Sequence, residues 1–177
     1  MKRVHSGDDG YTYIMYGERV AKEDDVVELL GSVDELNSLI GVVRSLKPPE
    51  DVEKLLRRLQ EILFRLGSDV ATPIAKLTKP RIEDEDLRWV EEKTKEYWEK
   101  IPEPRLVFVY PSGDPAASML HLARTVCRRA ERIASRLYHS NRLLKQHLVL
   151  LNRISDLLFV LARYTNHARG VKEELWP

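Results

Sequence analysis

The sequence predicts an all-α protein, a bundle of about five helices that follows an irregular N-terminal arm. Apolar residues recur at three- and four-residue steps through most of the chain from Asp25 onward, and prolines and glycines separate these periodic stretches. With 177 residues, of which 43% are hydrophobic, the chain can bury one sizeable core but is short for two domains. We therefore expect a single domain over residues 1–177, with the arm at 1–24 and the helical bundle at 25–177.

The arm and the first two helices differ in periodicity. Residues 1–24 have no sustained apolar period and contain three glycines, which predicts loop or irregular extended structure. The first helix is predicted over 25–46, before Pro48 and Pro49, and the second ends near Val70. The apolar series that predict these two helices are Val26, Leu30, Val33, Leu36, Ile40 and Val43, and then Leu55, Leu59, Ile62, Leu63 and Leu66.

The middle of the chain carries weaker signals. Residues 72–83 contain two prolines and no period, so we expect a surface loop there. The helix predicted over 84–100 has an acidic first turn but only a weak apolar stripe, which indicates a peripheral position. The run LVFVY at 106–110 is short, β-branched and aromatic, and therefore favours extended structure.

The last two helices are predicted from a clear start signal and from a nearly continuous apolar pattern. Asp114 followed by Pro115 marks a helix start, because the carboxylate accepts free amide protons and proline needs no donor at the first position. This helix is predicted to run to about Tyr138. The fifth, from about Leu143 to His167, is apolar on nearly all sides, which predicts that it lies in the middle of the bundle.

Net charge, apolar runs and cysteine content indicate which binding partners and which cell compartment to expect. The chain has 29 basic and 28 acidic residues, so its net charge of +1 provides no field that would hold nucleic acid or an anionic membrane. We find no run of 18 apolar residues and no signal peptide behind the start MKRVHSGDDG. The single Cys127 excludes an internal disulfide and suits a reducing cytoplasm, where we expect it to be an inert, packed thiol. We expect a cytoplasmic protein.

The segment HLARTVCRRAER at 121–132 places several charges on a helix that also has an apolar seam. At roughly 100° per residue, Arg124, Arg128 and Glu131 share one narrow stripe with His121. This stripe is either an ion-paired helix or subunit contact or a binding site. The broader second set, for which a solvated face is the plain alternative, comprises Arg129, Arg132 and Arg136.

Two other helices carry polar stripes. On the apolar fifth helix, the residues within about 60° of one another are Asn152, Asp156, Phe159 and Arg163. An unpaired buried polar group costs on the order of 1 to 3 kcal/mol, so this stripe must face polar groups, a ligand or a subunit. On the first helix the small polar stripe comprises Asp34, Asn37, Ser38 and Gly41. Asp34 is a natural partner for an arginine such as Arg124.

The arm contains SGDDGYT at 6–12, followed by Lys22. Closely spaced glycines let backbone amides turn toward one point and bind phosphate oxygens, and a lysine adds a point charge. The segment lacks the spacing of a Walker A loop or of a dinucleotide fingerprint, and two glycines around two aspartates more often form an ordinary turn. Its aspartates could also hold a magnesium ion. The remaining histidines, which we expect at the surface or at edges, are His121, His139, His147 and His167.

Taken in order, the chain resembles the PduO-type ATP:cob(I)alamin adenosyltransferases over essentially its whole length. The segments that carry the resemblance are SGDDGYT, GERVAK, DELNSLIG, DVATP, FVYPSGDPAAS, LHLARTVCRRAER and LNRISDLLFVLAR. The resemblance implies a ferritin-like five-helix bundle that forms a homotrimer and binds ATP and a corrinoid at each subunit interface. It also implies transfer of the 5′-deoxyadenosyl group of ATP to the cobalt of cob(I)alamin, with release of triphosphate.

The resemblance assigns residues by position. The ATP-binding residues that it implies are His5, Ser6, Gly7, Asp8, Gly10, Thr12, Lys22, Arg128, Glu131, Arg132 and Asn152. Among these, Lys22, Arg128 and Asn152 would act in catalysis. Asp34 and Arg124 match an ion pair between subunits, and Phe108 matches an apolar residue beneath the corrin ring. Magnesium would arrive with ATP, and we assign no protein side chain to it. The sequence departs from the family at Ser6, where threonine is usual, and near Ser112, where a second glycine is common.

Cobalt(I) is itself a strong nucleophile, so the protein would supply placement and electrostatics, not a general base. The alternative reading is a corrinoid-binding or delivery protein without turnover, and the resemblance also suggests a reductase and an adenosylcobalamin-dependent mutase as partners. A di-iron carboxylate bundle would need Glu-x-x-His pairs, and the sequence has none. A purely structural trimer would bind no nucleotide.

Overall fold

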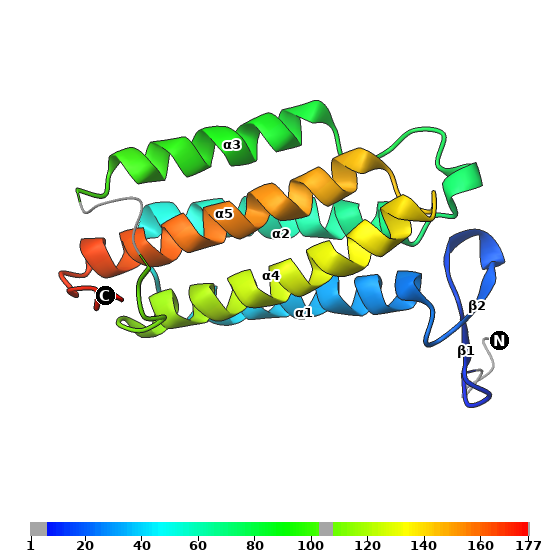
Figure 1. Ribbon diagram of the computed structural model, residues 1–177, viewed down its shortest axis with the longest axis horizontal. Helices are drawn as coiled ribbons and strands as arrows, with labels where there is room; N and C mark the ends of the chain where they lie inside the picture. Colours follow the sequence, from blue (N-terminus) through cyan, green and yellow to red (C-terminus); the bar gives the residue numbers. More distant parts are fainter. Residues whose placement is uncertain (1–6, 103–107, 177) are drawn as a thin grey trace.

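The computed structural model describes residues 7–102 and 108–176 and consists of five helices and one short hairpin (Figure 1). The helices are α1 (Asp25–Ser45), α2 (Glu50–Val70), α3 (Asp84–Glu99), α4 (Pro115–His139) and α5 (Lys145–Ala168). The helical class and the order of elements are as predicted. The helix ends differ from the predicted ones by no more than two residues.

Side-chain caps explain where two of the helices begin. Asp24 accepts a hydrogen bond from the Val26 amide at 2.8 Å and starts α1. Asp114 accepts one from the Ala116 amide at 2.8 Å, with Pro115 as the first residue of α4. These carboxylates satisfy amides that lack an intrahelical partner, so the start signal at Asp114 is confirmed.

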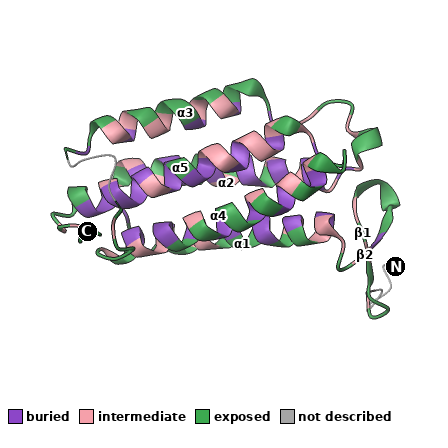
Figure 2. Ribbon diagram, in the orientation of Figure 1, coloured by how far each residue is buried: buried purple, intermediate pink, exposed green. Residues whose placement is uncertain are grey.

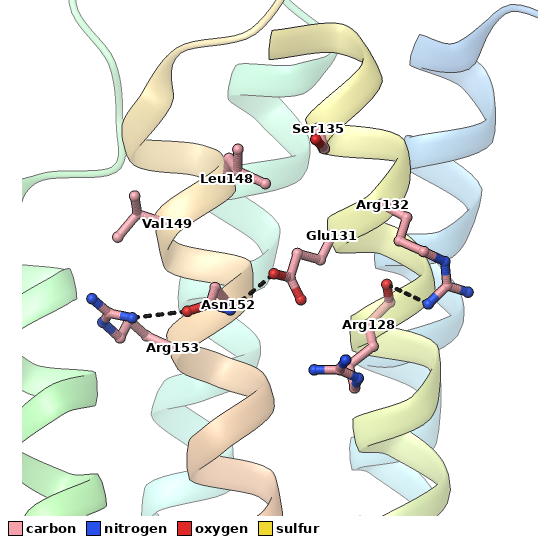
Figure 3. Close-up of a pocket in the computed structure, with 8 residues that line it drawn as sticks. All are labelled: Arg128, Glu131, Arg132, Ser135, Leu148, Val149, Asn152 and Arg153. Atoms are coloured by element: carbon pink, nitrogen blue, oxygen red, sulfur yellow. Dashed lines mark hydrogen bonds between the residues drawn. The ribbon is translucent and has the colours of Figure 1, made fainter. Parts of the chain in front are cut away.

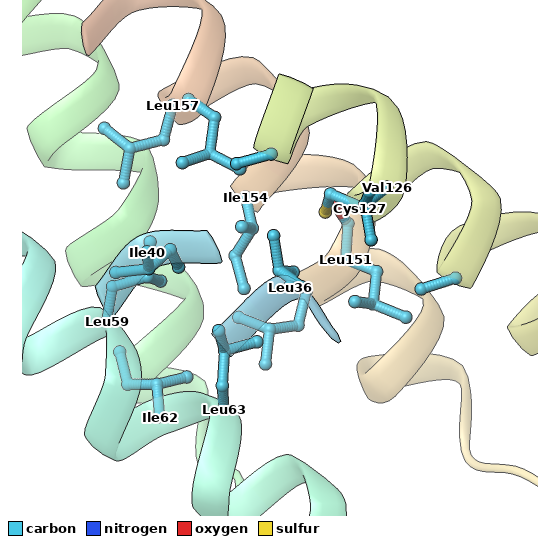
Figure 4. Close-up of a cluster of buried hydrophobic side chains, with 14 of the residues drawn as sticks. Leu36, Ile40, Leu59, Ile62, Leu63, Val126, Cys127, Leu151, Ile154 and Leu157 are labelled. Carbon is cyan, nitrogen blue, oxygen red and sulfur yellow. Dashed lines mark hydrogen bonds between the residues drawn. The ribbon is translucent and has the colours of Figure 1, made fainter. Parts of the chain in front are cut away.

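The four long helices share one apolar core, and α4 lies between α1 and α5 (Figures 1 and 2). Helix α5 is the most buried of them. Its side chains with no exposed surface include Leu150, Leu151, Ile154, Leu157 and Leu158. Figure 4 shows Leu151, Ile154 and Leu157 of α5 facing side chains from α1, α2 and α4. Helix α3 packs on the outside of α5 and buries few apolar side chains, so its predicted peripheral position is confirmed.

The N-terminal arm is more regular than expected. Strands β1 (Tyr11–Tyr13) and β2 (Arg19–Ala21) pair antiparallel, with Thr12 opposite Val20, and the short 3-10 turn η1 (Met15–Gly17) lies between them. The hairpin is attached to the bundle because the Met15 amide donates to the carbonyl oxygen of Ala71 at 2.9 Å. Backbone pairing over three residues per strand needs no long apolar series, so periodicity could not predict it.

The loop after α2, which contains the 3-10 turn η2 (Ile74–Lys76), is tied to the core by a buried carboxylate. Asp69 has 1% exposure and accepts hydrogen bonds from the amides of Arg81 and Ile82 at 2.9 to 3.0 Å. The Nε2 atom of His147, which is completely buried, lies 3.1 Å from Asp69. The expectation of a surface or edge position for His147 was therefore wrong, because the carboxylate supplies a partner inside the core.

Two of the arginines for which a solvated face was the plain alternative are exposed, and they also form ion pairs with the first helix. Arg136 donates to Asp25 at 2.7 Å and to Glu28 at 3.0 Å, and Arg129 forms an ion pair with Glu35. These contacts link the exposed edges of α4 and α1. None of the helices in the described part of the chain is both long and apolar enough to cross a membrane.

Candidate functional site

A cavity between α4 and α5 collects the polar residues that were singled out on these two helices (Figure 3). Its volume is about 410 Å³. The residues that line it are Arg128, Glu131, Arg132, Ser135, Leu148, Val149, Asn152 and Arg153. Four of them, Arg128, Glu131, Arg132 and Asn152, were predicted from the sequence to lie at one site, and the structure brings these four together.

Hydrogen bonds fix most of the polar groups in this α4/α5 cavity. The amide nitrogen of Asn152 donates to Glu131 at 2.9 Å across the cavity, and the amide oxygen of Asn152 accepts from Arg153 at 2.8 Å (Figure 3). Arg153 also binds Glu91 of α3 at 2.8 Å. Three arginines face one glutamate here, so the cavity is electropositive and suits an anionic ligand.

Arg128 is a cation of this cavity whose side chain has no hydrogen bond or ion pair within the described part of the chain. Its side chain is exposed and has no ion pair with any of the described carboxylates, whereas its backbone oxygen accepts a hydrogen bond from Arg132 at 3.1 Å. A guanidinium presents several donors in a fixed fork that matches phosphate oxygens. Arg128 is therefore the group in the cavity best prepared to bind a phosphate.

The hairpin brings together a second set of predicted residues. Lys22 lies over the glycine turn, since a Cβ atom built on Gly7 would be 3.1 Å from the Lys22 Nζ atom. The Lys22 amide donates to the carbonyl oxygen of Gly10 at 2.9 Å. Asp8 is exposed in the same turn, and Thr12 is half-buried in β1. The predicted residues His5 and Ser6 lie outside the described residues.

Asp34 and Arg124, the predicted ion pair, form no bond to each other among the described residues. Asp34 is exposed and lines a second cavity of about 300 Å³ between α1 and α2, next to Met15 of the arm. The Nε atom of Arg124 on α4 is buried and has no hydrogen-bond partner. Burial and the neighbouring Arg128 lower the pKa of Arg124. Each member of the pair thus lacks a counter-ion within the described chain.

The α4/α5 cavity and the hairpin lie apart in this chain. The hairpin extends from the beginning of α1 and contacts α2, whereas the cavity lies between α4 and α5 (Figure 1). No hydrogen bond or ion pair joins the two sets in the part of the chain that the structure describes. One protomer therefore presents two separate groups of predicted ATP ligands on different faces.

The segment after residue 107 carries Phe108, the predicted corrinoid contact. The Phe108 side chain is 80% exposed. Beyond it, the Asn166 side chain accepts a hydrogen bond from the Asp114 amide at 2.9 Å and donates to the Ser112 carbonyl oxygen at 3.0 Å. Gly113 has φ 109°, and any Cβ there would collide with the Asn166 amide. The part of the predicted extended run that the structure describes is confirmed as extended, since Val109 forms a β-bridge with Leu175.

His121 is buried, so its expected surface or edge position was also wrong. Its ring lies 5.9 Å from the ring of Phe159, and the Arg124 guanidinium lies 5.7 Å from the same phenyl ring. Burial, with smaller contributions from Arg124 and Arg163, lowers the pKa of His121 to about 4. The imidazole is therefore neutral at physiological pH. Cys127 is buried as predicted, and burial raises the pKa of its thiol.

Sequence reasoning missed four residues of the α4/α5 cavity, which are Ser135, Leu148, Val149 and Arg153. Ser135 lies one helical turn after Glu131, so the same projection that selected the arginine stripe could have found it. Arg153 directly follows Asn152 in the sequence. Leu148 and Val149 carry no polar signal, and only the packing of α5 against α4 identifies them as lining residues.

The chain is similar to known proteins over nearly its full length. The cobalamin adenosyltransferase family matches residues 3–165. A cobalamin adenosyltransferase from Cupriavidus metallidurans is 40% identical, with 98% of this chain and 92% of that protein covered. A corrinoid adenosyltransferase from Bacillus subtilis is 36% identical, with 94% of this chain and 86% of that protein covered.

Solved structures agree with these relatives. A variant of a PduO-type ATP:corrinoid adenosyltransferase from Lactobacillus reuteri, complexed with cobalamin and ATP, superposes with a TM-score of 0.90 at 34% identity. The superposition covers 97% of this chain and 96% of that chain. Sequence similarity and fold therefore agree along the whole bundle, and this chain belongs to the cobalamin adenosyltransferase family.

Proposed function

We propose that this protein transfers the 5′-deoxyadenosyl group of ATP to the cobalt of a cob(I)alamin-type corrinoid and releases triphosphate. The observation that carries the proposal is the electropositive α4/α5 cavity, in which Arg128 is a free cation beside the hydrogen-bonded Glu131 and Asn152. Family membership and the relative complexed with cobalamin and ATP support the choice of substrates.

The proposed step balances without a protein nucleophile. The electron pair of cobalt(I) attacks C5′ of ATP, a cobalt–carbon bond forms, and the C5′–oxygen bond breaks with its electrons leaving on triphosphate. Cobalt is thereby oxidised formally from Co(I) to Co(III). Arg128, Lys22 and the amides of the glycine turn would stabilise the charge that grows on the triphosphate, and magnesium would enter with ATP. Asn152 would orient the nucleotide.

We propose that the complete ATP site forms between subunits of a homotrimer. Asp34 and Arg124 each lack a counter-ion among the described residues and lie on different faces of one protomer. If Asp34 of one subunit pairs with Arg124 of the next, the two subunits meet through different surfaces, which is a heterologous contact. Three such contacts form a closed ring when the rotation from one subunit to the next is one third of a full turn. Because the hairpin lies beside the Asp34 cavity, this pairing would bring Gly7 and Lys22 toward the neighbour's Arg128.

The corrinoid would bind at the end of the bundle where Phe108 is exposed. A phenyl ring beneath the corrin would exclude water and leave the lower face of cobalt without a ligand, which favours cobalt(I). The proposal further includes a cytoplasmic location, a reductase that supplies cobalt(I), and a mutase that accepts the product.

Formation of the cobalt–carbon bond tests the function. Purified protein is mixed with ATP, magnesium and chemically reduced cobalamin, and the absorbance of adenosylcobalamin and the release of triphosphate are followed together. We expect one triphosphate per adenosylcobalamin and no reaction when ATP is omitted. Tight corrinoid binding with neither product would instead indicate a carrier, and absence of nucleotide binding would indicate a purely structural assembly.

A further inference from the structure

The C-terminal residues pair with the segment that carries Phe108. After α5 the chain turns at Gly170, and residues 172–176 run beside residues 108–110, near the beginning of α4 (Figure 1). The Tyr110 amide donates to the carbonyl oxygen of Glu174 at 2.9 Å, and the Trp176 amide donates to that of Phe108 at 2.8 Å. These bonds flank the bridge between Val109 and Leu175, so the tail and the Phe108 segment form a short antiparallel ladder.

Side chains reinforce this ladder on one side. The rings of Tyr110 and Trp176 lie edge to face, with centroids 5.8 Å apart. Together with Phe108 and Val109 they line an apolar hollow of about 310 Å³. Phe108 itself is highly exposed, so packing of its own side chain does not fix its place. Its position is instead set by the backbone that carries it, and that backbone is paired with the tail.

A buried ion pair holds the tail to the bundle. Arg163 of α5 has no exposed surface, and the Glu173 side chain is 8% exposed. The Arg163 Nε atom donates to Glu173 Oε2 at 2.8 Å, and the Nη2 atom of the same guanidinium also lies 2.8 Å from this oxygen. The guanidinium lies over the ring of Trp98, 5.4 Å from its centroid. Glu173 directly precedes the residue that binds Tyr110, so the ion pair fixes the tail at the start of the ladder.

We infer that Glu173 is a positioning residue for the corrinoid. It locks the C-terminal tail onto Arg163, and the tail in turn sets the direction in which Phe108 projects from the end of the bundle. The inference rests on the proposed function, in which Phe108 lies beneath the corrin ring. It assigns to Glu173 no contact with either substrate.

We call the ion pair between Glu173 and Arg163 the clasp of the tail, and matched single variants test it. Glu173→Gln removes the charge and keeps the shape, and Glu173→Asp keeps the charge on a shorter side chain. Glu174→Gln is the control, because it makes the same change of net charge one residue away, on an exposed side chain with no hydrogen bond or ion pair among the described residues. The backbone carbonyl group of Glu174, which binds Tyr110, is unaffected by that substitution.

The first measurement follows the ladder directly, without substrates. By hydrogen–deuterium exchange we expect Glu173→Gln to accelerate exchange of the Tyr110 and Trp176 amides, on the order of tenfold or more, while the core of α5 keeps its protection. Glu173→Asp should lie between Glu173→Gln and the wild type. Unchanged exchange in Glu173→Gln would overturn the clasp. Loss of protection throughout α5 would also overturn it, because Glu173 would then support the whole bundle.

The second measurement asks whether the clasp acts through Phe108. We expect Glu173→Gln to raise KM for cobalamin or lower kcat on the order of 10- to 100-fold, with KM for ATP unchanged. In a Phe108→Ala background the same substitution should have little further effect. Fully additive losses, or equal losses in Glu173→Gln and Glu174→Gln, would overturn the positioning role. If the wild type forms no cobalt–carbon bond, the proposed function fails, whereas the exchange measurement still decides the clasp.

Discussion

The α4/α5 cavity and the N-terminal hairpin offer groups suited to the same anion, but they hold these groups in different ways. In the cavity, Glu131, Asn152 and Arg153 are linked by hydrogen bonds on two long, buried helices. In the hairpin, Gly7 and Lys22 lie just outside two strands of three residues each, and half of those strand residues are exposed.

This difference indicates that the α4/α5 cavity is the more rigid part of the proposed ATP site. Helical side chains that are already paired lose little further freedom when a ligand arrives, so the cavity is preorganised. The hairpin depends on a few backbone hydrogen bonds, such as that from Met15 to Ala71. We therefore expect changes in the cavity to reduce the rate of reaction and changes in the hairpin to act mainly on nucleotide affinity.

The largest effect is expected in the cavity. Arg128→Ala should lower kcat/KM about 100- to 1,000-fold, because it removes a cation aimed at charge that grows in the transition state. Asn152→Ala should act in the same direction through loss of nucleotide orientation. Initial rates of adenosylcobalamin formation measure both. Arg88→Ala, which changes an exposed arginine of α3 with no hydrogen bond or ion pair among the described residues, is the control. Wild-type turnover in folded Arg128→Ala would refute the assignment.

The next effect concerns the proposed contact between subunits. Asp34→Ala and Arg124→Ala should each weaken assembly on the order of tenfold, which corresponds to about 1.4 kcal/mol. The double variant should lose less than the sum, because both substitutions remove one interaction. Sedimentation velocity over a dilution series measures assembly. Additive losses would show that the two residues do not form one pair, and the hairpin would then have no route to the neighbouring cavity.

A smaller effect is expected in the hairpin. Lys22→Ala should raise KM for ATP about fivefold, since an exposed charge is worth about 1 kcal/mol, and kcat should change less than in Arg128→Ala. Isothermal titration with a nonhydrolysable ATP analogue measures the affinity directly. Lys79→Ala changes an exposed lysine of the loop after α2 and serves as control. A kcat loss as large as that of Arg128→Ala would contradict the distinction between the two regions.

A last effect concerns stability and separates the two regions by pH. Burial lowers the pKa of His121 to about 4, against 6.5 for an ordinary histidine, and burial also lowers the pKa of His147. The unfolded chain therefore binds more protons, so stability is complete above about pH 6.5 and is lost as the pH falls toward 4. Each pH unit within this window should cost about 1.4 kcal/mol for His121. Residues 7–24 contain no histidine, so acid should act on α4 and α5.

Urea unfolding at fixed protein concentration, repeated between pH 8 and pH 5, measures this slope. His121→Gln should reduce the slope, whereas His139→Gln, which alters an exposed histidine, should leave it unchanged. An equal slope in His121→Gln and the wild type would mean that His121 does not contribute to acid sensitivity.

The sequence alone determined the helices and half of the residues that line the cavity. Apolar spacing and the signal at Asp114 and Pro115 predicted the five helices, and projection of α4 and α5 grouped Arg128 and Glu131 on one stripe and included Asn152 in another. These predictions succeeded because the helical period relates sequence distance directly to direction in space.

Tertiary structure decided which polar groups meet. The burial of His147 against Asp69 depends on residues 78 positions apart, and the bond between Glu173 and Arg163 depends on the turn that brings the tail back over α5. Neither pairing has a sequence period, because the partners belong to different elements whose relative position is set by packing of the core. The same reason explains why the sequence placed Gly7, Lys22 and Arg128 in one site, whereas the fold separates the hairpin from the cavity within a protomer.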